Sequence, residues 1–290
     1  MKEESYIKSP LNYTGGKFKL LPQILPLFPD DIDTFVDLFA GGCNVGINVE
    51  ANSIVFNDVN TSLIKMYEEM IQYSPKETLN RVKTCIKHYG LSKENEEGFK
   101  QLRAYYNLSK NPLDLYVLAS YSFNYQLRFN NKLEYNSSFG RHKISFNPRM
   151  ESRLIEFLNM LKHQRKNKML TFSNQHFFFV EHLALDNTDL VYCDPPYLIS
   201  NASYNDGKRG FGDWGIDEER HLLEVLDKLD KNGVRFALSN VIEHKGRIND
   251  ILIEWAKGYN VHYLNRNYNN CSYQGKDTNQ KTVEVLITNY

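Results

Sequence analysis

Short apolar runs alternate with segments of helical spacing along much of the chain. The apolar runs predict strands, and several of the segments between them predict helices. Strands are expected at 34–39, 53–58, 168–173, 189–193, 233–239, 259–264 and 282–288. Helices are expected at 62–71, 177–185, 217–230 and 246–257, and a further helix is expected to open within 44–51. Alternating strands and helices are typical of a parallel α/β sheet.

This alternation stops in the middle third of the chain. Polar helical segments come first there, followed by a more apolar segment at 114–125 that predicts a buried helix. Residues 130–140 favour a loop or hairpin, and 151–162 carries apolar residues along one helical face. The pattern therefore predicts one α/β domain, formed by 1–74 and 166–290, that is interrupted by a mainly helical insertion at 75–165.

Composition and charge narrow the class of protein. The chain has 290 residues, 41% of them hydrophobic, and 35 basic residues balance 35 acidic ones, so the net charge predicts no partner. It has no run of about 18 uncharged apolar residues and no signal-peptide core, which favours a soluble, cytoplasmic protein without a membrane partner. The cysteines lie far apart and the histidines have no metal-ligand spacing, so we expect reduced thiols and no bound metal.

Candidate chemistry gathers where predicted strands end, because ligands of open α/β sheets bind beyond the carboxyl ends of the strands. The turn at 39–42 (FAGG) follows the first strand, and its small residues let the backbone approach a ligand closely. Asp58 ends the second strand about twenty residues after Asp37, a position where an acid commonly accepts hydrogen bonds from ribose hydroxyls. An ordinary turn or a helix cap would explain each feature alone, but together they indicate a cofactor that contains adenosine.

The sequence VYCDPPY ends the strand predicted at 189–193. Because neither proline can donate a backbone N–H, Pro195 and Pro196 end the strand and hold Asp194 and Tyr197 on a stiff turn. A carboxylate and a backbone carbonyl there can accept both N–H groups of an exocyclic amine on a planar base. The nitrogen lone pair then localises and can attack a methyl group. Tyr197 can stack on the base, a contact worth about 1–3 kcal/mol, and a base inside a duplex must first be flipped out. A plain strand-ending turn with a capping acid is the alternative.

Taken together, these motifs resemble the Dam-type (D12 class) DNA adenine N6-methyltransferases, which use S-adenosylmethionine. The resemblance covers nearly the whole chain, and the GGK and DPPY motifs in this order are specific jointly. It rests on YTGGK at 13–17, the acid and glycine turn at 37–42, Asn57-Asp58, DPPY at 194–197 and KTVEVL at 281–286. It implies a Rossmann-like S-adenosylmethionine-dependent methyltransferase sheet, with an inserted DNA target-recognition domain at 75–165 and double-stranded DNA as the substrate.

The resemblance also implies roles for single residues. Catalytic positions would be Asp194, Pro195, Pro196 and Tyr197, and the cofactor pocket would comprise Tyr13, Lys17, Asp37, Phe39, Gly41, Asp58, His176, Phe177 and Asp194. The Lys17 ammonium suits the methionine carboxylate or the edge of the active site. Two positions depart from the family pattern. Cys43 stands where a third small residue is usual, and His176 stands where an Asp or Ser usually precedes an aromatic residue near the adenine ring.

Basic residues gather in 141–168, where eight bases face two acids in a protein of zero net charge. Such a concentration predicts a phosphate-binding face, although a solvated helix face has the same composition. The stretches 123–130 and 135–141 resemble the two arms of the family's DNA-reading hairpin. The resemblance implies DNA contacts by Asn12, Asn124, Gln126, Arg128, Asn130, Ser138, Arg141 and Lys143, with Arg128 at a position that reads guanine O6 and N7.

Other functions stay open at this stage. The acceptor could be cytosine N4 or an amide nitrogen, although those families prefer Ser or Asn where Asp194 stands, and a regulator that has lost catalysis could retain the fold. Cys193 is not expected to be a nucleophile, because it lacks the Pro-Cys context used for cytosine carbon 5. A restriction endonuclease acting on the same site is a candidate partner, and the glycine-rich segment 200–215 is a candidate lid.

The recognition sequence is the first testable point. GATC-specific members of the family usually have Lys, Leu and Pro where this chain has Asn12, Gln126 and Ser138, so two apolar contacts suited to a thymine methyl group have become polar. We hypothesise a target that keeps the adenine and a G·C pair read by Arg128 but departs from GATC. Methylome sequencing of DNA from cells that express the protein would report the base and its context, and fully efficient methylation of a GATC oligonucleotide would contradict the hypothesis.

Overall fold

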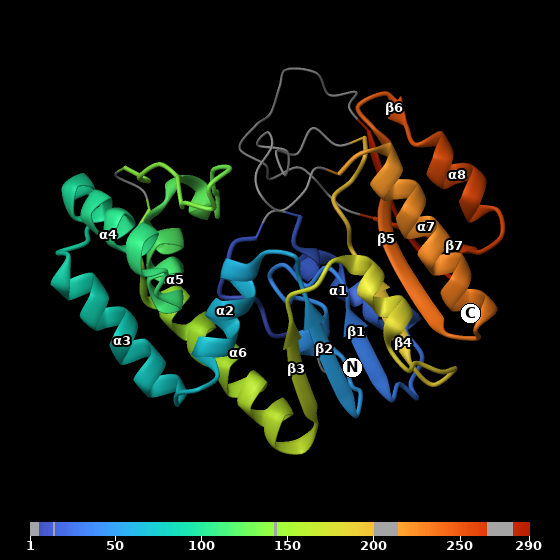
Figure 1. The fold of residues 1–290 in the computed structure, drawn as a ribbon, viewed down its shortest axis with the longest axis horizontal. Coiled ribbons are helices and arrows are strands. Elements are labelled where there is room, and N and C mark those ends of the chain that lie inside the picture. Colours follow the sequence, from blue (N-terminus) through green and yellow to red (C-terminus); the bar gives the residue numbers. More distant parts are fainter. Residues whose placement is uncertain (1–5, 14, 142–143, 200–213, 266–280) are drawn as a thin grey trace.

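The central feature of the computed structural model is a mostly parallel eight-stranded sheet, shown in Figure 1. The structure describes residues 6–13, 15–141, 144–199, 214–265 and 281–290. The parallel strands are β1 (Thr34–Asp37), β2 (Ser53–Asn57), β3 (Met169–Ser173), β4 (Leu190–Cys193) and β5 (Arg235–His244). β8 (Thr282–Thr288) runs antiparallel between β5 and β7 (Asn260–Leu264), and β6 (Arg247–Ile248) pairs with the end of β5.

The strand order decides where a ligand can bind. It runs β3-β2-β1-β4-β5-β8-β7, so the chain first winds outward from β1 to β3 and then returns to place β4 on the other side of β1. The crossovers leave in opposite directions at this point, which opens a crevice beyond the carboxyl ends of the two strands. Asp37 ends β1 and Asp194 follows β4, so both carboxylates are brought to that crevice.

Both faces of the sheet are covered. Phe35 of β1 belongs to a buried cluster with α2 (Thr61–Met70), whereas its neighbour Val36 belongs to a second cluster with α7 (Ile216–Lys231) and α8 (Asp250–Ala256). Successive strand residues point to opposite faces, and a sheet that is buried on both faces needs apolar residues at both. This explains why the central strands β1 and β4 read as continuous apolar runs, whereas the edge strands β3 and β7 are partly exposed. All seven predicted strands were found.

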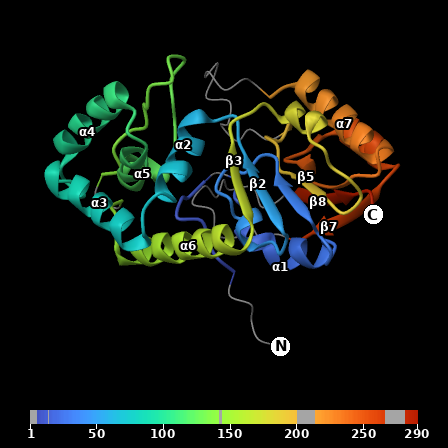
Figure 2. The ribbon, with the colours of Figure 1, turned by 60° about the horizontal axis from the view of Figure 1, so that its bottom comes forward.

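A helical lobe stands beside the sheet, as Figures 1 and 2 show. It consists of α3 (Pro75–His88), α4 (Glu96–Ser109) and α5 (Pro112–Tyr121), and α6 (Pro148–Asn167) runs from the lobe to β3. Three of these helices begin at a polar residue followed by proline, namely Ser74-Pro75, Asn111-Pro112 and Asn147-Pro148. In each pair the polar side chain accepts a backbone N–H of the first turn and the proline fills a position that needs no donor, so the sequence fixes these starts locally.

A hairpin-like loop, residues 122–139, projects from the lobe after α5. Its arms are joined by two antiparallel bridges, Ser122 with Phe139 and Phe129 with Tyr135. The Tyr135 hydroxyl lies 2.6 Å from Ser122 Oγ and donates to the Gln126 carbonyl oxygen, so a buried ring pins the two arms together. In Figure 1 this hairpin lies toward the same side of the molecule as the carboxyl ends of the strands.

Several predicted helices are wrong in extent or type. The segment 44–51 holds only a three-residue 3-10 turn, η3 (Gly46–Asn48), and 177–185 forms a 3-10 helix, η5 (Phe177–His182). The helix predicted at 114–125 ends at Tyr121, because Ser122 is extended; Asn124 and Tyr125 then adopt left-handed backbone angles with φ of 52° and 56°. Residues 247–248 pair with β5, so the helix predicted at 246–257 begins only at Asp250.

Short helical turns precede the sheet. They are η1 (Lys17–Leu20), α1 (Leu21–Ile24) and η2 (Leu25–Leu27), and proline lies in the first turn of both α1 and η2. Leu20, Leu21 and Ile24 enter the first buried cluster, which anchors the segment that leads out of the GGK motif. Within the described ranges, no helix has both the length and the apolar character needed to span a membrane.

Candidate active site

A cavity of about 250 Å³ opens at the carboxyl ends of β1, β2 and β4. It lies at the crevice between β1 and β4 that the strand order creates. Eleven residues predicted for the site line it: Tyr13, Lys17, Asp37, Phe39, Gly41, Asp58, His176, Phe177, Asp194, Pro195 and Pro196. Segments from four distant parts of the sequence therefore meet at one place.

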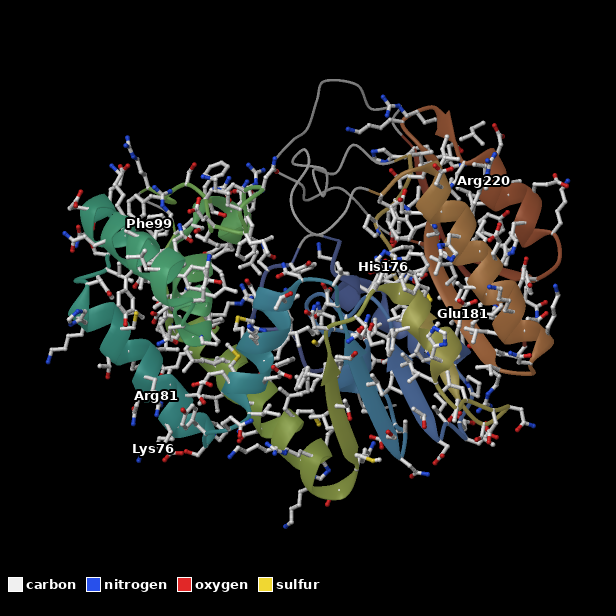
Figure 3. All side chains as sticks on the ribbon, in the orientation of Figure 1. Lys76, Arg81, Phe99, His176, Glu181 and Arg220 are labelled. Carbon is white, nitrogen blue, oxygen red and sulfur yellow. The ribbon has the colours of Figure 1, made fainter. Side chains whose placement is uncertain are left out.

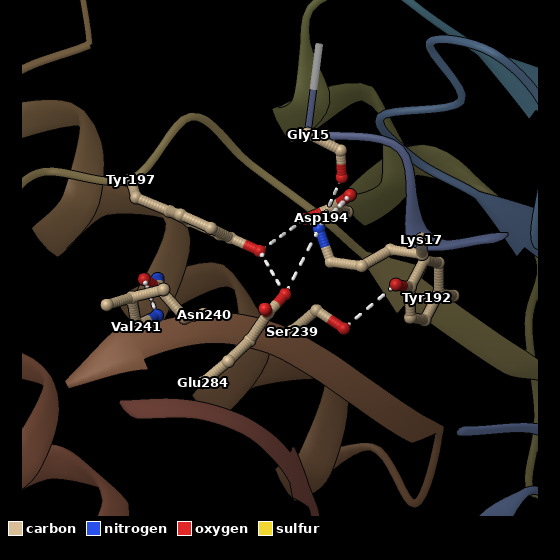
Figure 4. A network of polar contacts seen from close by, with 9 residues as sticks. All are labelled: Gly15, Lys17, Tyr192, Asp194, Tyr197, Ser239, Asn240, Val241 and Glu284. Carbon is tan, nitrogen blue, oxygen red and sulfur yellow. Dashed lines mark hydrogen bonds and ion pairs between the residues drawn. The ribbon is translucent and has the colours of Figure 1, made fainter. Parts of the chain in front are cut away.

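A buried ion pair joins the GGK motif to the DPPY motif, as Figure 4 shows. The Lys17 ammonium lies 2.6 Å from Asp194 Oδ1 and donates to Oδ2 at 2.7 Å, so it spans both carboxylate oxygens. It also donates to the Gly15 carbonyl oxygen at 2.9 Å. The Lys17 side chain is only 2% exposed. The Lys17 ammonium therefore lies against the DPPY motif at the edge of the cavity.

The fourth residue of the DPPY motif completes this arrangement. The Tyr197 hydroxyl donates to Asp194 Oδ1 and to Glu284 Oε1, both at 3.1 Å. Lys17 Nζ lies 5.0 Å from the centroid of the same ring, within the range of a cation–π contact. The Tyr197 ring, which is predicted to stack on a base, thus already contacts the Lys17 ammonium, and its hydroxyl contacts the carboxylates of Asp194 and Glu284.

Burial raises the pKa of the Asp194 carboxyl above its ordinary value, and the negative charge of Glu284 adds to this effect. The Lys17 ammonium and the Tyr197 hydroxyl oppose it, because both stabilise the charged carboxylate. Asp194, whose side chain is 20% exposed, is thus a partly buried acceptor whose charge depends on two specific partners.

The glycine turn is held from three directions. Gly41 has φ of +46°, and a Cβ on it would lie 2.8 Å from the Tyr13 ring, so both the conformation and the space require glycine. Its N–H donates to Asp58 Oδ2 at 2.9 Å, and its carbonyl oxygen accepts the Tyr67 hydroxyl at 3.0 Å. The close approach that the sequence assigned to a ligand is made here by the Tyr13 ring, which packs on the turn and lines the cavity.

Asp37 is buried beside this turn, and Asp58 is half-buried there. Asp58 also accepts the Asn60 N–H at 2.8 Å, while the cap of α2 is Asn60 itself, so Asp58 fixes the turn rather than the helix. Asp37 Oδ2 accepts the Gly46 N–H at 3.1 Å. Burial raises the pKa of Asp37 to about 7, and the nearby carboxylates of Asp194 and Asp58 add to the shift.

Aromatic side chains form another wall of the cavity. Phe39, Phe177 and Trp214 lie with ring centroids 5.6–5.8 Å apart, and Trp214 is fixed by an N–H bond to Glu219 at 2.8 Å. His176 lies 4.5 Å from Phe177 by ring centroids, and Figure 3 shows it where η5 begins, at the carboxyl edge of the sheet. Burial, together with His221, lowers the pKa of His176.

The residues predicted to contact DNA separate into groups. Asn124, Gln126, Arg128 and Ser138 lie in the hairpin, and Asn12 is exposed beside Tyr13. The Asn130 side chain closes the turn of the hairpin by accepting the N–H groups of Lys132 and Glu134. The Arg141 guanidinium is bound to Glu96 at 2.5 and 2.9 Å. Lys143 lies outside the described residues, as does nearly all of the candidate lid at 200–215.

Comparison with known proteins supplies the family. The model of "D12 class N6 adenine-specific DNA methyltransferase" matches residues 13–270, which include every motif that meets at the cavity. The chain belongs to this family.

Its relatives are modification enzymes and adenine methylases. The chain is 54% identical over 289 residues to "Type II methyltransferase M.FokI" of Planomicrobium okeanokoites, a match that covers 100% of this chain and 44% of that protein. It is 49% identical to "Modification methylase StsI" of Streptococcus sanguinis, with coverage of 99% and 43%. It is 27% identical to the "DNA adenine methylase" of Salmonella typhi, which covers 79% of each chain. The chain therefore spans less than half the length of the first two relatives.

Sequence reasoning missed two prominent residues of the site. Glu284 is 1% exposed and contacts both Lys17 and Tyr197. Its only signal was an acid inside the apolar run of the last strand. Trp214 lies at the end of a glycine-rich segment, where no periodic pattern indicated a buried ring. The lining also includes Asn44, Val59, Gln175 and Glu218, which no motif singled out.

The buried carboxyl of Asp37 predicts a pH-dependent stability. Its pKa is about 7 in the folded protein and about 3.9 in an unfolded chain. The folded state binds the extra proton between these values, so the free energy of unfolding falls as the pH rises from about 4 to 7, by up to about 1.4 kcal/mol per unit. We expect the free energy of unfolding of Asp37→Asn, measured by urea unfolding and taken relative to wild type, to be higher at pH 8 than at pH 5. An equal difference at both pH values would contradict this, and exposed Asp30→Asn is the control.

Proposed function

We propose that the chain transfers a methyl group from S-adenosylmethionine to N6 of an adenine that is flipped out of double-stranded DNA. The observation that carries this proposal is the position of the Asp194 carboxylate. It stands at the topological switch point of the sheet, beside the cavity and on a proline-stiffened turn. Membership of an adenine-specific family supports adenine over cytosine N4 or an amide nitrogen as the acceptor.

The residues of the cavity fit S-adenosylmethionine by their chemistry. Phe39 and Phe177 offer aromatic faces for an adenine ring, and each Asp58 oxygen retains a lone pair for a ribose hydroxyl. Asp37 and Asp194 bring negative charge to the side of the cavity where a cationic sulfonium would be favoured. When bound, this group supplies an activated methyl.

Asp194 and the carbonyl of Pro195 have the chemistry to hold the acceptor amine. An exocyclic amine donates two N–H bonds, and an acceptor on each of them draws the nitrogen toward tetrahedral geometry. Asp194 lines the cavity and forms an ion pair with the Lys17 ammonium. Lys17 therefore keeps the Asp194 carboxylate charged while that carboxylate accepts the N–H of the amine. The nitrogen loses a proton after transfer, and no covalent bond to the protein is needed.

We also propose that residues 75–165, with the hairpin, form the DNA target-recognition domain, and that 1–74 and 166–290 form the catalytic domain. The hairpin supports this assignment, since it projects toward the side of the sheet on which the cavity opens and carries Arg128. α6 continues to Asn167, so its last turn crosses the proposed boundary.

The predicted basic face is smaller than the sequence indicated. Arg141 and Lys168 are bound to Glu96 and Glu50, and Arg165 donates to the Ile71 carbonyl oxygen. What supports DNA binding instead is a cationic cluster, which we define as Lys8, Lys19, Arg149 and Arg153.

Like charges repel within this cluster. Burial and the charges of Arg153, Arg149 and Lys19 lower the pKa of Lys8. Arg153 is also close enough to interact electrostatically with Tyr125, where the chain enters the hairpin. Among the described residues no carboxylate forms an ion pair with any member of the cluster. We propose that DNA phosphates are the anionic partners of this cluster, which lies between the hairpin and the segment leading to Tyr13.

The support for a biological role comes from the names of the relatives. M.FokI and StsI are named as a type II methyltransferase and a modification methylase. We propose that this chain likewise protects DNA in the bacterial cytoplasm beside a restriction endonuclease of the same specificity.

The central test is Asp194→Ala. Wild type should transfer labelled methyl groups from S-adenosylmethionine to adenine in duplex DNA, and the variant should lose transfer by about a thousandfold or more, because the amine loses its charged acceptor. Binding of a target duplex, measured by fluorescence anisotropy, should change little. A wild type that binds DNA and transfers nothing would favour the regulator, and label on cytosine would favour the N4 enzyme.

The cationic cluster predicts a change in salt dependence. Replacing both Arg149 and Arg153 by Ala should reduce the slope of log affinity against log salt by about 2, because each phosphate contact contributes about 1. The loss should be the same for specific and unrelated duplexes. Lys228→Ala, which removes a cation paired with Glu181, is the matched control. An unchanged slope in the double variant would contradict the assignment.

A further inference from the structure

Glu284 is a buried carboxylate within the active-site network that the proposed reaction leaves without a role. It lies in β8 between Val283 and Val285, and it is 1% exposed. Its Oε1 accepts the Tyr197 hydroxyl at 3.1 Å and lies 3.6 Å from the Lys17 ammonium. Figure 4 shows it beneath the Lys17–Asp194 pair, opposite the Gly15 carbonyl. A charge buried in an apolar strand is costly unless specific partners hold it.

The network contains two carboxylates around one ammonium and one hydroxyl. Lys17 and Tyr197 each contact Asp194 and Glu284 at the same time. With Asp194 alone, any turn of its carboxylate toward a substrate would leave the 2%-exposed Lys17 ammonium and the half-buried Tyr197 hydroxyl without an anionic acceptor. With Glu284 in place, both groups retain one.

We propose that Glu284 is a positioning residue for the methyl-transfer step. It holds the Lys17 ammonium and the Tyr197 hydroxyl while Asp194 turns an oxygen to the adenine amine, so that the network changes partners without losing its geometry. The inference rests on the proposed function. It adds a residue from the last strand to a site otherwise built from the GGK and DPPY motifs.

Glu284 also affects the charge of Asp194. The groups that act on Asp194 or feel its charge are Lys17, Tyr197, Glu284, Asp37, Tyr192 and Cys193. Among them Glu284 raises the pKa of Asp194, whereas Lys17 and Tyr197 lower it. Replacing Glu284 by Gln therefore lowers this pKa, and the acid limb of the pH–rate profile, which reports ionised Asp194, should move to lower pH.

The experiment compares wild type, Glu284→Gln and Glu243→Gln in single-turnover methylation of duplex DNA over a range of pH. Glu243 lies on the adjacent strand, pairs with Val283 in the sheet and forms an ion pair with Lys281 rather than with the network, so it is the matched control. We expect Glu284→Gln to lower the rate at neutral pH by about tenfold or more, with the acid limb at lower pH and with cofactor and DNA affinities within about twofold of wild type.

Tyr197→Phe distinguishes positioning from general damage to the fold. If Glu284 acts through Tyr197 and Lys17, its substitution costs less in the Tyr197→Phe background, so the two effects are non-additive. Additive effects with an unmoved acid limb would overturn the inference, as would a wild-type rate in Glu284→Gln. Should that variant fail to unfold cooperatively, Glu284→Asp keeps the charge but shortens its reach, and a wild-type rate there would also overturn it. A wild type without activity would instead overturn the proposed function.

Discussion

The contact between the Lys17 ammonium and the Asp194 carboxylate is the interaction on which the site depends. It joins residues 177 positions apart in the chain, and it fastens the first segment of the protein to the turn that follows β4. Because Lys17 is almost fully buried, the pair forms at a large desolvation cost that only good geometry offsets. The Gly15 carbonyl, Tyr197 and Glu284 provide that geometry. Removing Asp194 would leave the almost fully buried Lys17 ammonium with the more distant Glu284 carboxylate, 3.6 Å away, as its counter-charge, which weakens the network.

Around this pair, the cavity is shaped by contacts within the protein that leave its acidic groups facing inward. Tyr13 packs on the Gly41 turn, and Asp58 holds the same turn through its backbone N–H. Asp37 and Asp194 end neighbouring parallel strands, so the sheet itself forces two carboxylates close together. Burial raises the pKa of both carboxyls, and the negative charge of Asp194 raises the pKa of Asp37 further. Such a site favours a cationic ligand, because a positive charge between the strands would relieve that repulsion.

Features of the fold and the site could be predicted from the sequence where neighbouring residues in the chain determine them. The central strands were predicted because burial on both faces makes them continuous apolar runs, and DPPY marked the end of β4 because proline cannot continue a strand. The helix predicted at 177–185 was wrong, because the segment forms a tight 3-10 helix at Phe177–His182, which places Phe177 in the cavity wall. Glu284 was missed because its partners lie on other elements, and the pairing of Arg141 with Glu96 depends on how α4 packs beside the hairpin. Tertiary contacts of this kind leave no periodic pattern in the sequence, so they could not be predicted from it.

The packing of the helical lobe bears on how base reading and chemistry could be coupled. The lobe packs directly on the rest of the protein, because residues of α5 and α6 share one buried cluster with α2 and with Phe35 and Ile54 of the sheet. α2 is capped by Asn60, two residues after Asp58, and Tyr67 of α2 donates a hydrogen bond to the Gly41 carbonyl oxygen. The element that supports the hairpin thus packs directly on the element that fixes the cavity. If the hairpin reads a base pair, the distance from that base to Asp194 is set by side-chain packing across α2 and α5, and a core substitution there would disturb catalysis without touching DNA or the cavity.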